Sequence, residues 1–301
     1  MLQIYLILEQ TNMNNILVTG TNGQLGHEIQ NLSLKYPHYS FTFTDRTALD
    51  LSDLRATEDF FKGKRFDAII NCAAYTAVDK AESEDELADT INHRFVSMLA
   101  KIAKRDDSKL IHISTDYVFN GQSHRPYIEN DPTEPQGIYG KTKCAGEKAI
   151  LEISPKNTII LRTSWVYSAY GNNFVKTMLR LGRERNSLGV IFDQVGTPTY
   201  ARDLASVILE IIPKIDNQAP ELYHYSNEGV ASWYDFAKAI FELSGITCEV
   251  NPINTDQYPT PASRPHYSVL NKSKIKNDFN LTIAYWRDSL QSCLKALGEN
   301  E

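Results

Sequence analysis

The chain has no long hydrophobic run: none of its apolar stretches approaches the ~20 residues that a membrane-spanning helix requires. It also has no excess of basic residues. The formal net charge is −6, and the lysines and arginines are scattered rather than clustered. Such a surface offers no sequence-independent attraction for nucleic acid or for an anionic membrane. We therefore expect neither a membrane nor a nucleic acid as a partner.

Cysteine is scarce, and its spacing excludes two further classes. The four cysteines contain no C-x-x-C pair, so the sequence predicts neither a zinc site nor a disulfide framework; they are Cys72, Cys144, Cys248 and Cys293. The first dozen residues lack the basic segment and the cleavage site of a secretory signal. The first strand begins near Met13, which makes residues 1–12 an extension. We expect a cytoplasmic protein.

From residue 16 onward, short apolar runs alternate with longer amphipathic stretches, which is the pattern of βαβ units around a parallel sheet. The predicted strands are Ile16–Val18, Phe41–Phe43, Ala68–Ile70, Leu110–Ile113 and Thr158–Leu161. The predicted helices between them are Gln24–Leu34, Asp53–Phe61, Asp85–Ala103 and Tyr139–Ile153. Because crossover connections are right-handed, the expected fold class is α/β, with a doubly wound, Rossmann-like parallel sheet.

Beyond residue 167 the alternation loosens, which indicates a second, smaller domain. We expect residues 13–167 to form a nucleotide-binding Rossmann domain and residues 168–301 mainly a substrate-binding domain. A part at about 190–212 is expected to return to the first domain, with Val190–Phe192 as a further strand of its sheet. The predicted helices of this half are Asn173–Leu181, Ala201–Ile212, Ser232–Ser244 and Trp286–Leu297.

A glycine-rich turn follows the first predicted strand. Gly20, Gly23 and Gly26 are spaced three residues apart and lead into a predicted helix. Glycines at such a point let the backbone approach a pyrophosphate, and the helix then presents its free N-terminal amides to it. A turn that merely joins a strand to a helix would explain the glycines alone equally well. The position at the first βα junction therefore favours binding of a nicotinamide dinucleotide.

The choice between NADH and NADPH stays open from the sequence. Asp45 follows the second predicted strand, where an acidic residue binds the ribose 2′-hydroxyl of NAD. Arg46 follows directly and is suited to the 2′-phosphate of NADP, although a solvent-exposed charge explains it equally well.

A catalytic pair is suggested by Tyr139 and Lys143, which lie one helical turn apart on the same face, about 5–6 Å from each other at Cβ. The Y-x-x-x-K pattern is weak alone, and Tyr234 with Lys238 repeats it. Only the first pair follows a buried strand that ends at Thr115, and ligands bind at the carboxyl edge of a parallel sheet. We therefore choose Tyr139 and Lys143.

The chemistry of a carbonyl reduction suits this trio. The oxygen of a carbonyl that accepts hydride must also receive a proton, but a free tyrosine with pKa ~10 holds its proton too tightly to exchange it in balance near neutrality. The Lys143 ammonium and an oxidised nicotinamide ring would favour the phenolate form of Tyr139. The Thr115 hydroxyl can hold the substrate oxygen near the phenol.

At this point the chain resembles the extended short-chain dehydrogenase/reductases, and within them the dTDP-4-dehydrorhamnose reductase family, from about residue 13 almost to the C-terminus. The segments that carry the resemblance are GTNGQLG (20–26), NCAAYTAVDKAE (71–82), STDYVF (114–119), YGKTKCAGE (139–147), RTSWVY (162–167), GNNFVKTMLR (171–180), DQVGTPT (193–199) and RPHYSVL (264–270). The resemblance implies reduction of dTDP-4-dehydro-β-L-rhamnose to dTDP-L-rhamnose by NADPH or NADH, a step toward cell-surface polysaccharide.

The resemblance also implies roles for residues that match the family motifs. Thr115, Tyr139 and Lys143 match its catalytic trio. The cofactor-binding positions are Gly20, Gly23, Gln24, Leu25, Gly26, Asp50, Leu51, Ala73, Ala74 and Tyr75, together with Tyr139 and Lys143. The nucleotide-sugar positions are Asp116, Trp165, Asn172, Asn173 and Arg264. Among them Trp165 offers a stacking face and Arg264 a bidentate phosphate clamp, although a core tryptophan and a surface arginine are the simpler explanations.

The family resemblance raises the question of a metal, because some relatives dimerise through Mg²⁺ held by acidic residues. Glu28 could serve, but Arg202 stands where a partner carboxylate would align. A cation at that position repels a metal ion, so we expect no metal site. The oligomeric state, including a possible homodimer, stays open.

Two alternatives to the reductase were weighed. Nucleotide-sugar 4,6-dehydratases follow the threonine with Asp-Glu, whereas Thr115 is followed here by Asp116 and Tyr117, so the dehydratase base is missing. A non-catalytic regulatory subunit on the same fold would not need the catalytic trio, which is intact.

Overall fold

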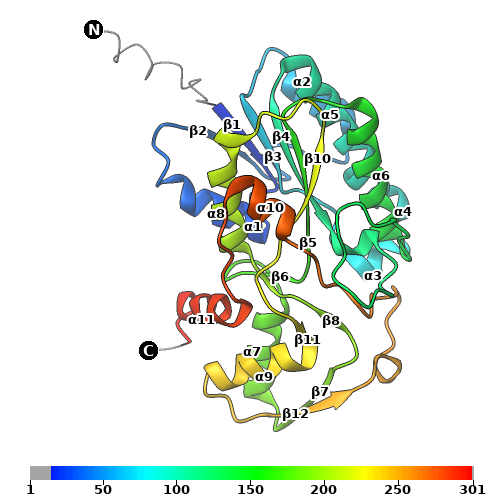
Figure 1. Ribbon diagram of the computed structural model, residues 1–301, viewed down its shortest axis with the longest axis vertical. Helices are drawn as coiled ribbons and strands as arrows, with labels where there is room; N and C mark the ends of the chain where they lie inside the picture. Colours follow the sequence, from blue (N-terminus) through cyan, green and yellow to red (C-terminus); the bar gives the residue numbers. More distant parts are fainter. Residues whose placement is uncertain (1–14, 300–301) are drawn as a thin grey trace.

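The computed structural model describes residues 15–299 and contains a parallel sheet of six strands (Figure 1). The strand order is β10-β5-β4-β3-β1-β2. The strands are β1 (Asn15–Thr19), β2 (Ser40–Thr44), β3 (Ala68–Asn71), β4 (Lys109–Thr115), β5 (Thr158–Thr163) and β10 (Glu221–His224). The first five were predicted, and the doubly wound α/β fold is confirmed. The proposed extension before residue 13 lies outside the described residues.

The helices cover both faces of the sheet because the strands are apolar on both faces. Ile16 and Val18 pack with α1 (Gln24–Ser33), α8 (Ala201–Ile211) and α10 (Ser273–Phe279). Leu17, between them, points to the opposite face and packs with α5 (Phe95–Asp106) and α6 (Ile138–Ile153), while α2 (Leu54–Phe61) contributes its last residue there. Alternation along β1 therefore decides which helix each side chain meets.

The predicted helix Asp85–Ala103 is interrupted. It consists of α4 (Asp85–Asp89), a π-helical turn (Thr90–Arg94) and α5, after the short α3 (Val78–Ala81). The carbonyl of Asn92, inside the π turn, faces α6 so closely that a Cβ on Gly146 would lie 2.2 Å from it. Gly146 thus permits a tight approach of α6 to this turn, and π turns are frequent at functional sites.

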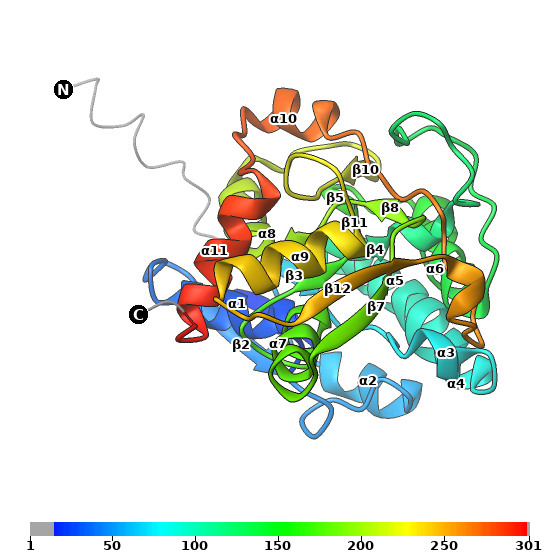
Figure 2. The ribbon, with the colours of Figure 1, turned by 90° about the horizontal axis from the view of Figure 1, so that it is seen from below.

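A smaller lobe lies below the sheet in Figure 1 and faces the viewer in Figure 2. Its core contains Phe236, Trp286 and Leu290. Its helices are α7 (Phe174–Glu184), α9 (Trp233–Leu243) and α11 (Trp286–Ala296). Its strand pairs are β7 (Ser187–Ile191) with β12 (Glu249–Ile253), β8 (Val195–Gly196) with β11 (Ala231–Ser232), and β6 (Val166–Tyr167) with β9 (Thr199–Tyr200).

One expected strand is corrected. Val190–Phe192 was expected to return to the main sheet, but β7 pairs with β12 in the smaller lobe. The sixth strand of the sheet is β10, which pairs with β5 and was not predicted. The part of 190–212 that does join the first half is α8, which packs against α1. The division into domains remains a proposal.

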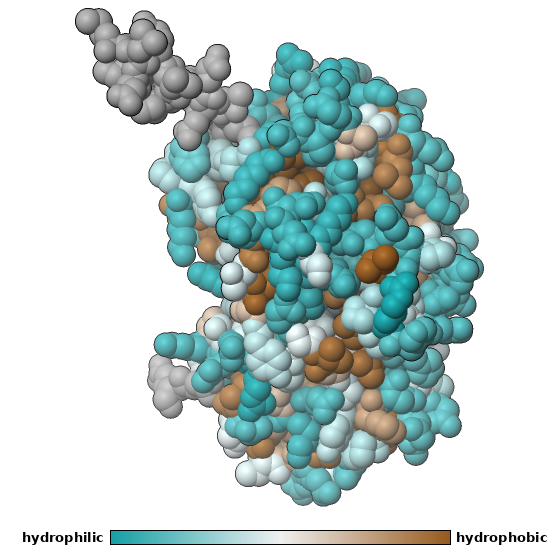
Figure 3. All heavy atoms as spheres, in the orientation of Figure 1, coloured by the Kyte–Doolittle hydropathy of each residue, from teal (hydrophilic) through white to brown (hydrophobic). Residues whose placement is uncertain are grey.

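The face of the molecule seen in Figure 3 is mostly hydrophilic, with smaller separate hydrophobic areas. Exposed large apolar side chains are spread along the chain, as Leu34, Phe192 and Val230 illustrate. Within residues 15–299, no helix combines the length and the apolar character needed to cross a membrane.

Candidate active site

The glycine-rich turn between β1 and α1 is built by close backbone contacts. Gly20 has φ +72°, in the left-handed region that favours glycine. A Cβ on Gly26 would lie 2.4 Å from the Gly20 carbonyl oxygen. Gly23 begins α1 without any side-chain cap, and the first turn of the helix has no acidic residue. The first amides of α1, from Gln24 to Gly26, are therefore available to an anion, which fits the pyrophosphate of a dinucleotide.

The turn lies against the segment that follows β3. A Cβ on Gly20 would meet the Ala73 backbone at 2.7 Å, so the two loops touch where β1 lies between β2 and β3. This is the point at which strand order reverses, and ligands of doubly wound sheets bind there. Asn92 holds the Tyr75 backbone at both its N–H (2.9 Å) and its C=O (3.1 Å). The segment Ala73–Tyr75 is thereby positioned beside the glycine turn.

The residues after β2 are occupied by local hydrogen bonds. Asp45 accepts from the Asn22 amide (3.0 Å) and from the backbone N–H groups of the turn that follows, and these bonds lower its pKa. The Arg46 side chain is exposed and lies 4.0 Å from Asp50. Asp50 accepts from Ser52, while Leu51 packs against the core beneath α5.

Tyr139 sits in the first turn of α6, and a glycine brings that turn to the end of β4. A Cβ on Gly140 would lie 2.3 Å from the carbonyl oxygen of Tyr117. Tyr117 belongs to the 3-10 turn Asp116–Val118 that directly follows β4. Its ring stands edge-on to the Tyr139 ring, with 5.4 Å between centroids. The sequence neighbour of the tyrosine thus determines how near α6 approaches Thr115.

Thr115 ends β4 and caps the 3-10 turn. Its hydroxyl accepts from the Tyr117 N–H (3.2 Å) and donates to Asp116 (3.0 Å). Burial raises the pKa of Asp116 to about 6. Burial also raises the pKa of Tyr139 to about 12, while the neighbouring Thr115 hydroxyl opposes this rise. The phenol is therefore fully protonated near neutrality, which suits a proton donor in the direction of reduction.

Lys143 is buried, with 1% of the residue exposed. Its ammonium donates to the Ile113 carbonyl (2.6 Å) and lies 3.3 Å from Nε2 of His112. Burial lowers the pKa of Lys143 to about 8, and Glu147 on the same helix opposes this. Besides burial and the Thr115 hydroxyl, the Asp116 carboxylate also raises the pKa of Tyr139, and the effect of Lys143 on the phenol stays a prediction.

Trp165 follows β5 with φ +50°, an uncommon conformation for a bulky residue. Its ring stacks on Trp233 with centroids 3.6 Å apart, and a Cβ on Gly196 would lie 2.7 Å from it. One face of the predicted stacking residue is thus covered by another tryptophan. Strain of this kind gathers at ligand sites.

Of the two neighbouring asparagines, Asn173 is hydrogen-bonded and Asn172 is exposed. The Asn173 side chain caps α7 through Lys176 N–H (3.1 Å) and donates to Ser168 C=O (2.7 Å) and Gln24 (3.0 Å). It therefore joins the glycine turn to the smaller lobe. Asn172 is exposed.

Arg264 is held by Asp79 in a bidentate ion pair, with N–O distances of 2.9 and 2.8 Å. Asp79 lies on α3, shortly after the segment beside the glycine turn, and its pKa is lowered by the Arg264 guanidinium. The planar fork that was predicted to clamp a phosphate therefore faces a carboxylate in this state.

Glu28, the candidate metal ligand, is buried in α1. It accepts from Ser168 (2.6 Å), and Arg202 lies 3.6 Å from its second oxygen. Among residues 15–299, no group of three or more His, Cys, Asp and Glu side chains could hold a metal ion.

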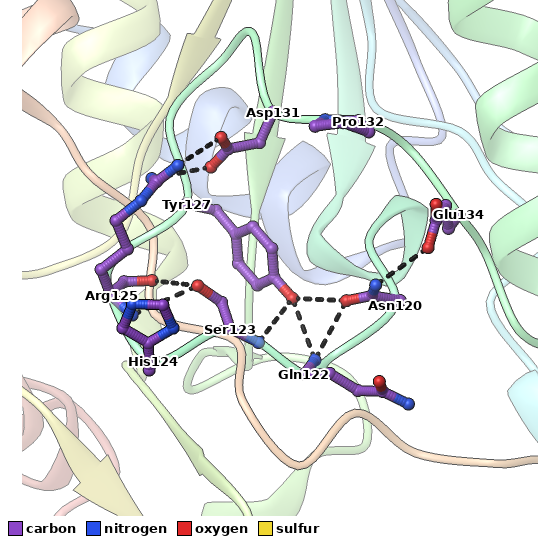
Figure 4. Close-up of a pocket in the computed structure, with 9 residues that line it drawn as sticks. All are labelled: Asn120, Gln122, Ser123, His124, Arg125, Tyr127, Asp131, Pro132 and Glu134. Atoms are coloured by element: carbon purple, nitrogen blue, oxygen red, sulfur yellow. Dashed lines mark hydrogen bonds and ion pairs between the residues drawn. The ribbon is translucent and has the colours of Figure 1, made fainter.

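A polar cavity of about 290 Å³ lies in the loop between β4 and α6, but none of the predicted catalytic residues lines it (Figure 4). The loop is held by its own contacts. Tyr127 donates to Asn120 (2.9 Å), and Arg125 pairs with Asp131 (2.8 Å). This cavity is separate from the Tyr139 site.

Sequence reasoning missed several residues around the site. His112 and Asn92 lie in runs that read as ordinary strand and helix, and Asp79 pairs with a residue 185 positions away. Two side chains behind Tyr139, Glu147 and Arg162, form a buried ion pair of 2.7 Å that joins α6 to β5. A charged residue at a core position of a predicted helix or strand was the available signal.

Comparison with known proteins agrees with this arrangement. The family described as RmlD substrate binding domain matches residues 13–299. The dTDP-4-dehydrorhamnose reductase of Aggregatibacter actinomycetemcomitans is 42% identical over 290 residues, covering 93% of this chain and 98% of that protein.

Two solved structures are similar over nearly the whole chain. A dTDP-4-dehydrorhamnose reductase from Clostridium acetobutylicum is 42% identical with a TM-score of 0.89, covering 94% of this chain and 99% of that one. The enzyme from Bacillus anthracis, solved in complex with NADP, is 37% identical with a TM-score of 0.88 and the same coverage. The protein described here therefore belongs to the dTDP-4-dehydrorhamnose reductase family.

Proposed function

We propose that this protein reduces the C4 ketone of dTDP-4-dehydro-β-L-rhamnose to give dTDP-L-rhamnose, with Tyr139 as the proton donor. The observation that carries the proposal is the close approach of Gly140 to the Tyr117 carbonyl, which seats the Tyr139 turn of α6 against Thr115. This contact lies at the carboxyl end of β4, on the same sheet edge as the glycine turn after β1. Two relatives that cover nearly the whole chain, those from Aggregatibacter actinomycetemcomitans and Clostridium acetobutylicum, carry the name of this reductase.

The nicotinamide, when bound, supplies hydride to the carbonyl carbon. Tyr139 gives its phenolic proton to the carbonyl oxygen, so ketone, hydride and proton yield the alcohol and a tyrosinate that is reprotonated from solvent. Thr115 holds the carbonyl oxygen by a hydrogen bond. Lys143 binds the nicotinamide ribose, and its positive charge stabilises the tyrosinate.

For the cofactor we propose NADPH as the preferred form, with NADH also accepted. The Asp45 oxygens already accept three hydrogen bonds, which leaves little capacity for a ribose hydroxyl. Arg46 is exposed and next to it, and guanidinium groups bind phosphate well. The Bacillus anthracis relative was solved with NADP.

We propose that the protein is active without Mg²⁺. The Arg202 guanidinium lies beside the Glu28 carboxylate and already supplies the positive charge that a metal ion would bring there. A homodimer and a cytoplasmic location remain predictions.

The test is an assay of the purified full-length protein with dTDP-4-dehydro-β-L-rhamnose and with NADPH or NADH in turn. We expect NADPH oxidation that depends on the sugar nucleotide, with dTDP-L-rhamnose as the product. Oxidation should continue after treatment with a chelator. A protein that binds both ligands without turnover would instead be the regulatory subunit, and formation of a 4-keto-6-deoxy product from dTDP-glucose would indicate a dehydratase.

A further inference from the structure

Three polar side chains form a row across the α6 face of the sheet, in a layer that is otherwise apolar. Thr19, Asn71 and His112 lie on adjacent strands and are register partners in turn, Thr19 with Asn71 and Asn71 with His112. Two residues earlier on the same strands and face stand Leu17, Ile69 and Leu110. Each member of the row is at most 1% exposed. Burying three polar groups costs free energy unless they satisfy one another.

The row is hydrogen-bonded from end to end and terminates at the lysine of the proposed active site. The Thr19 hydroxyl donates to Oδ1 of Asn71 (2.7 Å), and Nδ2 of Asn71 lies 2.9 Å from Nδ1 of His112. Nε2 of the same imidazole lies 3.3 Å from Nζ of Lys143, which also donates to the Ile113 carbonyl. Thr19 directly precedes the glycine turn, so the row spans the sheet from the cofactor loop to α6.

The row supplies an acceptor for one of the N–H groups of Lys143. A lysine ammonium has three N–H groups and no acceptor. The Ile113 carbonyl takes one, and the imidazole takes the second if its Nε2 carries a lone pair. We propose that His112 is a positioning residue for Lys143, whose third N–H is thereby turned toward the cofactor crevice. This inference rests on the proposed function, because it assigns His112 a role through Lys143.

The direction of the hydrogen bonds follows from the charge on Lys143. Opposite a charged ammonium, Nε2 accepts and Nδ1 carries the proton, which requires the Asn71 side-chain amide to be turned over so that its oxygen faces Nδ1. The structure has the opposite sense, in which Thr19 donates to the Asn71 oxygen and the Asn71 amide nitrogen faces Nδ1, and this sense suits a neutral Lys143 amine. The imidazole is neutral in both states, since burial and the nearby Lys143 lower the pKa of His112 well below its usual range.

Loss of the imidazole therefore weakens the charged form of Lys143 more than the neutral form, because hydrogen bonds from a charged donor are the stronger ones. The titratable groups that face Lys143 are His112 on β4 and, on its own helix, Glu147 and Tyr139. With Glu147 unchanged, removing the acceptor lowers the pH at which Lys143 loses its proton.

The experiment compares pH profiles of kcat in the full-length enzyme at saturating NADPH. For His112→Leu we expect the alkaline limb to move to lower pH by about one unit, as for loss of one charge-assisted hydrogen bond. We expect kcat to fall about tenfold from misplacement of Lys143, with KM for the sugar nucleotide within about twofold. In His112→Gln the side-chain amide oxygen replaces Nε2 as the acceptor. This variant should restore most of kcat and most of the wild-type position of the alkaline limb.

The matched control is His224→Leu. His224 is also fully buried, but it lies on the edge strand β10, two strands away from β4, and bonds the Tyr127 carbonyl. This change should lower the melting temperature and leave the pH profile unchanged. A wild-type profile in folded His112→Leu, or failure of His112→Gln to restore it, overturns the proposal.

A milder variant covers the case in which His112→Leu does not fold. Thr19→Val keeps the shape and removes the hydroxyl that orients Asn71, so we expect a smaller shift of the limb in the same direction; an unchanged limb overturns the proposal. Lys143→Met separates this inference from the proposed function. If Lys143→Met keeps wild-type turnover, the assigned role of the lysine fails. If Lys143→Met loses turnover while His112→Leu keeps the wild-type pH profile, only the role of His112 is refuted.

Discussion

Helices α6 and α9 carry the same Y-x-x-x-K pattern, yet their surroundings differ in every respect that matters for chemistry. On α6, Tyr139 stands beside the end of a central parallel strand, and Lys143 is buried with hydrogen-bond partners on β4. On α9, Tyr234 packs against the core of the smaller lobe. The pattern alone says only that two side chains share a helix face, and the neighbouring elements decide the rest.

The starts of the two helices show the same contrast. Ser232 and Asp235 form a capping box that satisfies the first turn of α9. The first turn of α6 has no such cap, and Gly140 lets it approach the Tyr117 carbonyl. The residue after the tyrosine is a glycine on α6 and the capping Asp235 on α9. The first turn of α6 thus approaches the end of β4, whereas the first turn of α9 is satisfied by its own capping box.

The sharpest way to test this contrast is to remove one phenolic hydroxyl from each helix. Tyr139→Phe should lose about 10²–10⁴-fold in kcat with NADPH binding retained, because the proton donor is gone. Turnover is measured as NADPH oxidation, and binding by fluorescence titration with NADPH.

Tyr234→Phe is the matched control and should keep turnover within about twofold, as for a change outside the chemistry. A comparable loss in both variants would show that the second pair had been wrongly dismissed.

The next largest effect should come from filling the close contact on α6. Gly140→Ala places a methyl group 2.3 Å from the Tyr117 carbonyl, so the turn that holds Tyr139 must move. We expect kcat to fall by about 10²-fold, as for displacement of a reacting group by about 1 Å. Lys141→Ala, at the exposed neighbouring position, should retain activity. Equal kcat in the two alanine variants would contradict the assigned importance of this contact.

A third prediction concerns the ion pair between Arg264 and Asp79 on α3. Arg264→Ala should raise KM for the sugar nucleotide by about 10–100-fold, the loss of one or two hydrogen bonds to a charged group, with a smaller change in kcat. Asp79→Asn removes the carboxylate that holds Arg264 and should change KM less, because the guanidinium stays available. KM is measured in the NADPH oxidation assay, and isothermal titration with dTDP measures the affinity of each variant for the nucleotide. A larger effect of Asp79→Asn would mean that the ion pair, rather than Arg264 itself, supports binding.

The smallest predicted effect is a pH dependence. Burial lowers the pKa of Lys143 to about 8, so the lysine is charged below that pH and increasingly neutral above it. Turnover at saturating substrate should therefore decline several-fold as the pH rises past about 8 and stay level below it until other groups titrate. Lys238→Met, the matched change on α9, should leave the profile unaltered. A profile that is flat through this range would contradict the proposed role of a charged lysine.

Much of the fold could be read from the chain because the determinants are local. The runs around Ile16, Ala68 and Leu110 are apolar on both faces, as central parallel strands require. The predicted ends of these strands differ from the observed ends by at most two residues. β10 was missed because Glu221–His224 is short and polar at both ends, so only its pairing with β5 makes it a strand. Likewise β7 resembled a core strand, and its partner β12 is set by the fold of the smaller lobe.

The candidate site divides in the same way. Gly23 and Gly26 are needed for close backbone contacts within the β1–α1 turn itself, and the positions of Thr115 and Tyr139 follow from strand and helix ends. The partners of these groups are distant in sequence. His112 is 31 residues from Lys143, and Asp79 is 185 residues from Arg264. No local pattern marks either contact.

By itself, the sequence determined the alternation of strands and helices, the anion-binding turn and the presence of a phenol and an amine on one helix face. Backbone sterics and hydrophobic periodicity act over a few residues, so these features are legible in the order of amino acids. Only the tertiary structure decided how closely the Tyr139 turn approaches its strand end, which acceptors hold the lysine and how a strained tryptophan is supported. Those outcomes depend on burial and on partners brought together by packing, where removal of water sets both the pKa values and the strength of each hydrogen bond.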